Sequence, residues 1–189
     1  MPKIMPIFIL ALSCVSCGST SSSSEAKPGP SFEGKTFSEH GLTISRPEGW
    51  VFIQPDSSVG PDTVLLMQGP IGDATLAPTV EISRRTLTAS QQRRKPSHIL
   101  TQMTTEIVQY FDGFEMIGAP EDLKLGGVDA SQLSLKYTET LPDGEAVPRL
   151  GKFFGIVRGQ YIWVIRCMGS PDGSNDGDFD KVLATVSFS

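Results

Sequence analysis

One stretch constrains the fold of this chain more than any other, the segment Lys152 to Met168 with the sequence KFFGIVRGQYIWVIRCM. Two apolar runs rich in β-branched and aromatic residues flank a short glycine-containing link, which predicts a β-hairpin. In the second run, strand alternation puts apolar side chains on both faces. One face carries Tyr161, Trp163, Ile165 and Cys167, and the other carries Ile162, Val164 and Met168. A strand that is apolar on both faces is covered on both, so we place it in the middle of a sheet.

The remaining patterns predict more strands and one long helix. The segments Thr79 to Thr86 and Ala130 to Thr138 alternate polar and apolar residues, as half-buried strands do. Ser97 to Phe111 carries an apolar stripe at helical spacing, with Ser97 as its expected N-cap and Gly113 as its expected stop. A short helix from about Phe179 to Thr185 and a closing strand end the chain. About eight strands joined mostly by hairpin-like links, without a repeated strand–helix–strand rhythm, predict an α+β fold: an antiparallel sheet packed with helices.

The first 16 residues, MPKIMPIFILALSCVS, have the layout of a signal peptide. One lysine precedes an apolar run that is too short to span a bilayer as a helix, and small residues follow. A cysteine directly after such a segment resembles the lipobox of bacterial lipoproteins, in which the cysteine is diacylated. We favour Cys17 as the lipidated residue and keep Cys14 as the alternative. A simple cleaved signal with two bystander cysteines is the third possibility.

Residues 17–33 are rich in serine and proline and have little to bury, which predicts a disordered tether. Residues 34–189 then form one domain of common size. Two acyl chains give a stable membrane attachment. Because a signal peptide directs export, we expect this domain to sit outside the cytoplasm, on the periplasmic face or the surface of a bacterial cell. The net charge of −5 argues against nucleic acid as a partner, because phosphate binding needs a basic surface.

Four segments in this order resemble the PsbP-like superfamily, which includes the Ran-binding Mog proteins and many small bacterial lipoproteins. They are GLTISRPEGWVF (Gly41 to Phe52), GGVDASQLSLKY (Gly126 to Tyr137), FFGIVRGQYIWVIRCMGS, and FDKVLATVSF near the end of the chain. The resemblance covers roughly Phe37 to Ser189 and implies an antiparallel sheet sandwiched by helices. It also implies an adaptor without catalysis, since the family shares no catalytic motif.

Two local patterns are candidate sites. The acidic loop from Asp172 to Asp180 places oxygen-bearing residues at alternate positions, as a calcium loop does: Asp172, Ser174, Asp176, Asp178 and Asp180. However, Leu183 stands where such a loop has a bidentate glutamate, and the alternative is a polar turn that favours the start of the last helix. The second pattern concentrates positive charge and suggests an anionic partner or a solvated strand end: Arg84, Arg85, Arg93, Arg94 and Lys95.

No sequence pattern predicts catalysis or a cofactor. The two histidines, His40 and His98, have no partner in the sequence that would make either a catalytic base, and nucleophile-elbow, Walker and HExxH motifs are absent. Cys167 is expected to be a buried core residue beside Trp163. We therefore expect a membrane-anchored, extracytoplasmic lipoprotein that binds a protein or an envelope component without catalysis. The alternative is a lipoprotein that binds a small ligand or Ca²⁺ in the acidic loop or between helix and sheet.

Calorimetric titration with Ca²⁺ separates the two interpretations of the acidic loop. A calcium loop gives heat of binding and a raised melting temperature, because an ion that binds only the folded chain stabilises it. A polar turn gives neither. Absence of both effects would end the calcium interpretation.

Overall fold

The computed structural model describes residues 34–55, 60–71, 76–108, 111–141 and 143–189. The predicted signal peptide, the tether and both candidate lipidation sites, Cys17 and Cys14, lie outside the described residues. The described chain forms two antiparallel sheets that pack against two α-helices, so the α+β prediction is confirmed. Within this part of the chain, no helix is both long enough and apolar enough to cross a membrane.

The larger sheet has seven strands in the order β3-β4-β5-β9-β8-β7-β6. Their bounds are β3 Val51–Ile53, β4 Thr63–Gln68, β5 Thr79–Thr86, β6 Asp112–Leu125, β7 Val128–Thr140, β8 Ala146–Arg158 and β9 Tyr161–Gly169. The smaller sheet has the order β1-β2-β10, with β1 Thr36–Glu39, β2 Leu42–Ser45 and β10 Ser187–Phe188. The helices are the 3₁₀ turn η1 Gln91–Arg93, then α1 Pro96–Ile107 and α2 Asp176–Leu183.

The predicted hairpin forms the middle of the larger sheet. β8 and β9 pair from Leu150 opposite Gly169 to Arg158 opposite Tyr161, which leaves Gly159 and Gln160 as a two-residue turn. Gly159 has a φ of 57°, and a glycine with positive φ at this first turn position is what a type II′ hairpin needs. β9 is the fourth of seven strands, so the central placement is confirmed.

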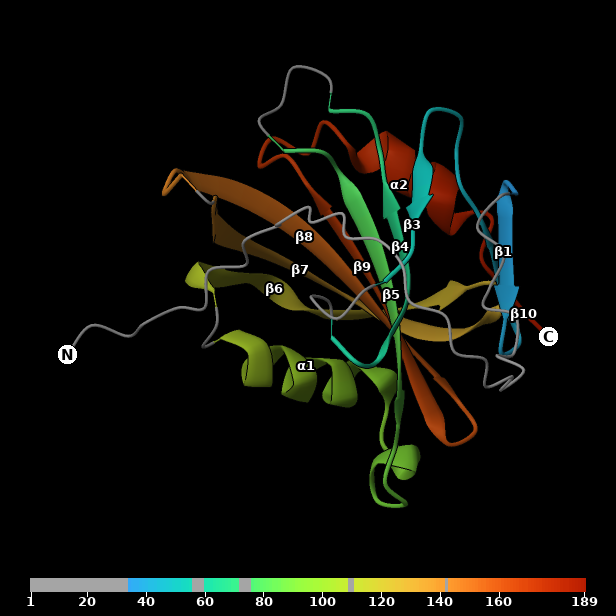
Figure 1. Cartoon of the computed structure of the whole chain (residues 1–189). Coiled ribbons are helices and arrows are strands. Elements are labelled where there is room, and N and C mark those ends of the chain that lie inside the picture. Colours follow the sequence, from blue (N-terminus) through green and yellow to red (C-terminus); the bar gives the residue numbers. More distant parts are fainter. Residues whose placement is uncertain (1–33, 56–59, 72–75, 109–110, 142) are drawn as a thin grey trace, which may run out of the picture.

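Each face of β9 contributes to a different core. Trp163, Ile165 and Cys167 join the first core, with α2 and the small sheet. Ile162 and Val164 join the second core, with α1 and β7. Figure 1 shows α1 on one side of the large sheet, and α2, β1 and β10 on the other. The expected burial of Cys167 is confirmed, since its side chain is fully buried.

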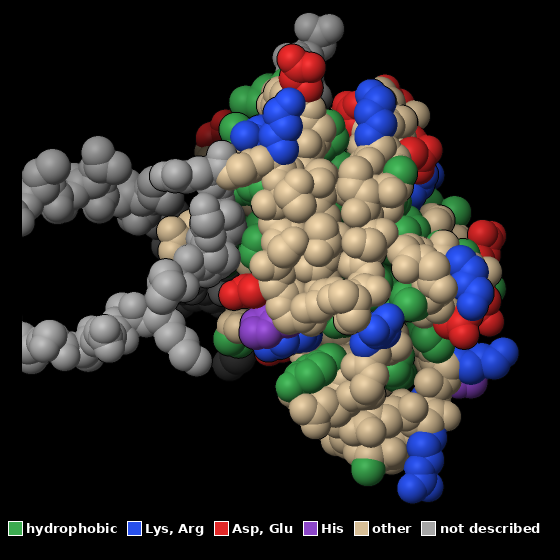
Figure 2. All heavy atoms as spheres, turned by 90° about the vertical axis from the view of Figure 1, so that its right-hand side faces the viewer, with side chains coloured by type: hydrophobic (Ala, Val, Ile, Leu, Met, Phe, Trp, Pro, Cys, Tyr) green, Lys and Arg blue, Asp and Glu red, His purple; other side chains and the backbone are tan. Residues whose placement is uncertain are grey.

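The small sheet differs from the expectation of a single sheet. β1 and β2 form a hairpin whose turn places His40 and Gly41 at positive φ, and β10 pairs with the free side of β2. Both ends of the described chain therefore meet in one layer that covers the first core. Figure 2 shows the side of the molecule that carries this layer, which is mostly backbone and uncharged polar side chains, with Lys and Arg scattered around it.

Three helix boundaries also differ from the sequence prediction. α1 starts at Pro96, with Lys95 at the N-cap and no side-chain cap, so Ser97 is not the N-cap. It ends at Ile107, and Gly113 lies in β6 rather than at a helix stop. α2 starts at Asp176 instead of Phe179, because Asp176 and Asp178 in its first turn favour the helix N-terminus.

Glycine lets α1 approach the sheet closely. A Cβ added to Gly155 on β8 would lie 3.3 Å from the Cβ of Leu100 on α1. Leu100 and Ile99 are almost fully buried there. α1 packs on β6, β7 and β8, and it leaves the same face of β4 and β5 largely without helix cover (Figure 1). This arrangement creates the cleft described below.

We expect Ile165→Ala to lower the free energy of unfolding by about 2–5 kcal/mol, the usual cost of truncating a large core side chain. Ile165 is fully buried at the centre of the sheet, so a cavity replaces the lost contacts. The matched control is Val51→Ala, because Val51 is 52% exposed. Urea denaturation measures both, and equal effects of the two substitutions would contradict the central placement of β9.

Candidate functional site

A cleft of about 390 Å³ lies between α1 and the face of β4, β5 and β9. β5 and β9 contribute polar side chains from alternate positions, because residues two apart on a strand share a face. α1 contributes the opposite wall. The lining side chains that matter most are Thr63, Glu81, Ser83, Arg85, Leu100, Met103, Thr104, Glu106, Phe153 and Arg166.

An ion pair forms the floor of the cleft. Arg166 Nη1 donates to Glu81 Oε1 at 2.6 Å, and the Thr63 hydroxyl donates to the same oxygen at 2.8 Å. The side chains of Glu81 and Arg166 are only 16% and 23% exposed. The guanidinium of Arg166 also lies over the Phe153 ring, 5.8 Å from its centroid. Four strands, β4, β5, β8 and β9, thus hold one carboxylate and one guanidinium in fixed positions.

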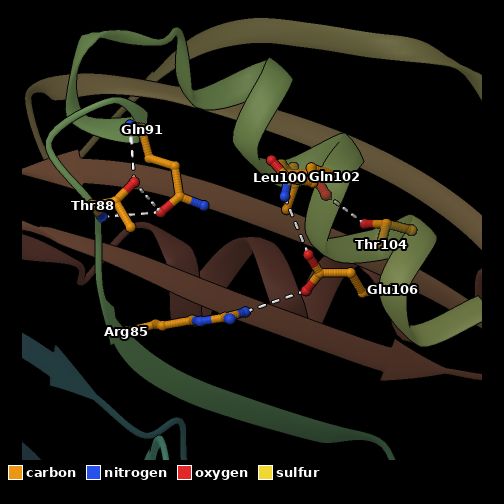
Figure 3. Close-up of polar contacts among 7 residues, drawn as sticks. All are labelled: Arg85, Thr88, Gln91, Leu100, Gln102, Thr104 and Glu106. Atoms are coloured by element: carbon orange, nitrogen blue, oxygen red, sulfur yellow. Dashed lines mark hydrogen bonds and ion pairs between the residues drawn. The ribbon is translucent and has the colours of Figure 1, made fainter.

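A second ion pair joins the sheet to the helix at the edge of the cleft. Arg85 Nη1 on β5 lies 3.3 Å from Glu106 Oε2 on α1, and both side chains are 49% exposed. Figure 3 shows the Arg85 side chain extending to Glu106. The amide of Gln102 donates to the other Glu106 oxygen at 3.2 Å. An exposed pair of this kind adds little stability.

Two hydroxyls with little exposure complete the polar lining. Ser83 is 5% exposed and Thr104 is 1% exposed. Thr104 donates to the Leu100 carbonyl within α1 at 2.8 Å, which leaves its oxygen lone pairs as acceptors (Figure 3). The cleft therefore combines donors and acceptors with an apolar wall from Leu100, Met103 and Phe153.

A smaller cavity of about 240 Å³ lies on the same face, beside Arg149 and Tyr137. Arg149 is 4% exposed, and its Nη2 donates to the carbonyl oxygens of Ala77 and Met168, each at 3.1 Å. Its Nε lies 3.6 Å from Glu139 Oε2, an ion pair too long for a hydrogen bond. Arg149 thus fastens β8 to β9 and to the segment before β5.

The positively charged residues do not form one patch. Strand alternation puts Arg84 and Arg85 on opposite faces of β5. Arg84 lies over the rings of Tyr161 and Trp163, at 4.7 and 5.6 Å, whereas Arg85 points to α1. Arg93 is in η1, Arg94 follows it, and Lys95 lies 3.7 Å from Asp122. An anionic partner for these residues stays a prediction.

The acidic loop has the geometry of a turn followed by a helix start. The Asp172 carboxylate accepts a hydrogen bond from the Ser174 backbone N–H, which lowers the pKa of Asp172. Asp176 pairs with Lys152 at 2.7 Å and Asp178 with Lys181 at 2.8 Å. Among the described residues, no three His, Cys, Asp or Glu side chains converge as metal ligands. Calcium binding here stays a prediction.

Of the side chains that line the cleft, sequence reasoning singled out Arg85 alone as a candidate site residue, although a signal for another was present. Arg166 is the only charged residue in the otherwise apolar run from Tyr161 to Met168. A charge in a strand covered on both faces needs a partner. The partner, Glu81, is 85 residues away in the sequence, so only the fold reveals it.

We expect a phenolate transition near pH 12 in the native protein. Burial raises the pKa of Tyr137 to about 12, although Arg149 acts in the opposite direction. Because the folded pKa exceeds the unfolded value of about 10, the associated stability is complete below pH 10 and falls by about 3 kcal/mol as the pH rises to 12. Phenolate absorbance measures the transition, and Tyr137→Phe removes it. Persistence of the transition in that variant would contradict the assignment.

Comparisons with known proteins bear on the fold. No family model matches the chain, and no curated protein sequence matches it. Three similar solved structures are the cyanobacterial PsbP (CyanoP) of Synechocystis sp. PCC 6803, a protein of Bacteroides thetaiotaomicron, and LpqN of Mycobacterium tuberculosis, which is described as involved in cell envelope biogenesis.

The likeness to CyanoP has a TM-score of 0.58 at 11% identity, and it covers 90% of this chain and 98% of that one. The Bacteroides protein gives 0.55 at 16%, over 83% of this chain and 49% of that one. LpqN gives 0.51 at 20%, over 77% and 83%. Identities this low establish the fold alone. The chain therefore has a PsbP-like fold, as its sequence segments indicated.

Proposed function

We propose that this chain is a membrane-anchored, extracytoplasmic lipoprotein that acts as a non-catalytic module for binding a protein or an envelope component. The observation that carries the proposal is the PsbP-like fold shared with LpqN, a protein described as involved in cell envelope biogenesis. The signal-like residues 1–16 and the cysteine after them support the same location. CyanoP and LpqN are not known as enzymes, which is consistent with a role in binding.

The binding role is further supported by how the charges of the cleft are arranged. Glu81 is engaged by Thr63 and Arg166, and Arg85 lies against Glu106. Catalysis by general acids and bases needs groups that are available to a substrate proton. Here the charged groups hold one another in place, an arrangement suited to recognition. The cleft also favours a second candidate function, a lipoprotein that binds a small ligand.

We expect the mature chain to begin at a lipidated Cys17. Mass spectrometry of protein purified from bacterial membranes would give an N-terminal peptide heavier by a diacylglycerol group. Two fatty chains make the attachment stable, so Cys17→Ser should move the protein from the membrane fraction to the soluble fraction. Cys14→Ser is the matched control, and it should leave the membrane fraction unchanged.

Two outcomes of this experiment would change the proposal. Loss of attachment in Cys14→Ser, with Cys17→Ser still bound, would move the anchor to Cys14. An unmodified N-terminus with both cysteines removed would end the lipoprotein proposal.

A further inference from the structure

The cleft between α1 and the sheet is polar but has almost no net charge. Two opposite pairs, Glu81 with Arg166 and Arg85 with Glu106, account for four of its five charged residues, and Asp62 at its edge is the fifth. An anionic ligand would have to displace Glu81 from Arg166, and a cationic ligand would have to displace Arg166 from Glu81. Breaking a pair that is mostly buried leaves an uncompensated charge, which is costly. The charge pattern therefore disfavours ions and favours a neutral ligand.

The same groups present many hydrogen-bonding atoms to such a ligand. Carboxylates accept and guanidinium groups donate, and Ser83 and Thr104 also line the cavity. A ligand hydroxyl both donates and accepts, so neighbouring hydroxyls on a ring can bond to a carboxylate and a guanidinium together without breaking the ion pair.

The opposite wall is apolar and the volume suits a small molecule. Met103 on α1 provides partly exposed hydrocarbon surface opposite the polar floor, backed by the nearly buried Leu100 and Phe153. Methionine adapts its shape to a ligand more readily than branched side chains do. The cavity of about 390 Å³ falls within the range of about 300–1,000 Å³ in which small-molecule sites occur. A sugar ring has the same combination of polar and apolar surface, with hydroxyls at its rim and C–H groups on its faces.

We propose that this cleft binds a neutral saccharide of one or two rings. Glu81 and Arg166 contact its hydroxyls, and the partly exposed Met103 contacts its ring face. Arg85 and Glu106 pair at one edge of the cleft, and Figure 3 shows this contact. The inference deepens the proposed envelope-binding function, because it names the class of envelope component that the domain recognises.

Titration of the full ¹⁵N-labelled chain tests the site. The neutral probes are glucose, galactose, mannose and N-acetylglucosamine, and the charged analogues of glucose are glucuronate and glucosamine. We expect at least one neutral sugar to shift amide signals in three segments with a Kd of millimolar or lower. The segments are 81–85, 100–106 and 164–166. Both charged analogues should bind more weakly.

Glu81→Gln keeps the shape of the floor and leaves Arg166 without its carboxylate. We expect affinity for the neutral sugar to fall about tenfold, the loss typical of a hydrogen bond to a charged group, and affinity for glucuronate to rise. Glu115→Gln is the matched control, because Glu115 is exposed on β6 away from the cleft, and it should change neither affinity. If Glu81→Gln fails to fold, Ser83→Ala tests the same floor and should also weaken sugar binding.

Three results would overturn the inference: no shift with any neutral sugar, shifts confined to residues outside the cleft, or tighter binding of a charged analogue by the unaltered chain. None of these results bears on the lipid anchor, which is tested separately by mass spectrometry.

Discussion

The burial of β9 on both faces is the constraint on which the rest of this structure depends. A strand with Trp163, Ile165 and Cys167 on one side and Ile162 and Val164 on the other needs two covering layers. Apolar side chains left in water on either face would remove the main favourable term in folding. The two ends of the described chain supply one layer, as the small sheet and α2. α1 supplies the other layer from the middle of the sequence.

The two layers differ in extent, and this difference creates the cleft. The first core is covered by three strands and a helix, and it is closed by large side chains such as Trp50 and Phe179. The second core is covered mainly by α1, which has 12 residues and packs on β6, β7 and β8. The face of β4 and β5 beyond the helix carries polar residues at the alternate positions of β5, among them Glu81 and Ser83. The part of the sheet that α1 leaves uncovered is thus also the part that carries polar side chains.

The sequence predicts the features that neighbouring residues encode, and it does not predict those that residues far apart in the chain form together. The hairpin, the two-faced burial of β9 and the apolar stripe of α1 are local patterns, and they were predicted correctly. Gly118, Ala119 and Pro120 interrupt the pattern of β6, so alternation alone does not predict one long strand there. The structure continues the strand through them with a register shift between Ile117 and Glu121, which an edge strand tolerates. The small sheet and the cleft join residues distant in the sequence, and no local pattern encodes their pairing.

The position of Arg166 connects the fold with the proposed binding role. In the middle of a sheet, a charged side chain is costly unless it is paired and hydrogen-bonded. Glu81 provides the pairing, and Phe153 provides a ring for the guanidinium. Apolar residues in place of both Glu81 and Arg166 would fit the core with less difficulty, since apolar replacements of buried ion pairs are often neutral or stabilising. The fold therefore does not require the Glu81–Arg166 pair for stability. The position of this pair on the floor of the cleft suits a role in recognition. A ligand can reach the pair because α1 covers only part of this face of the sheet.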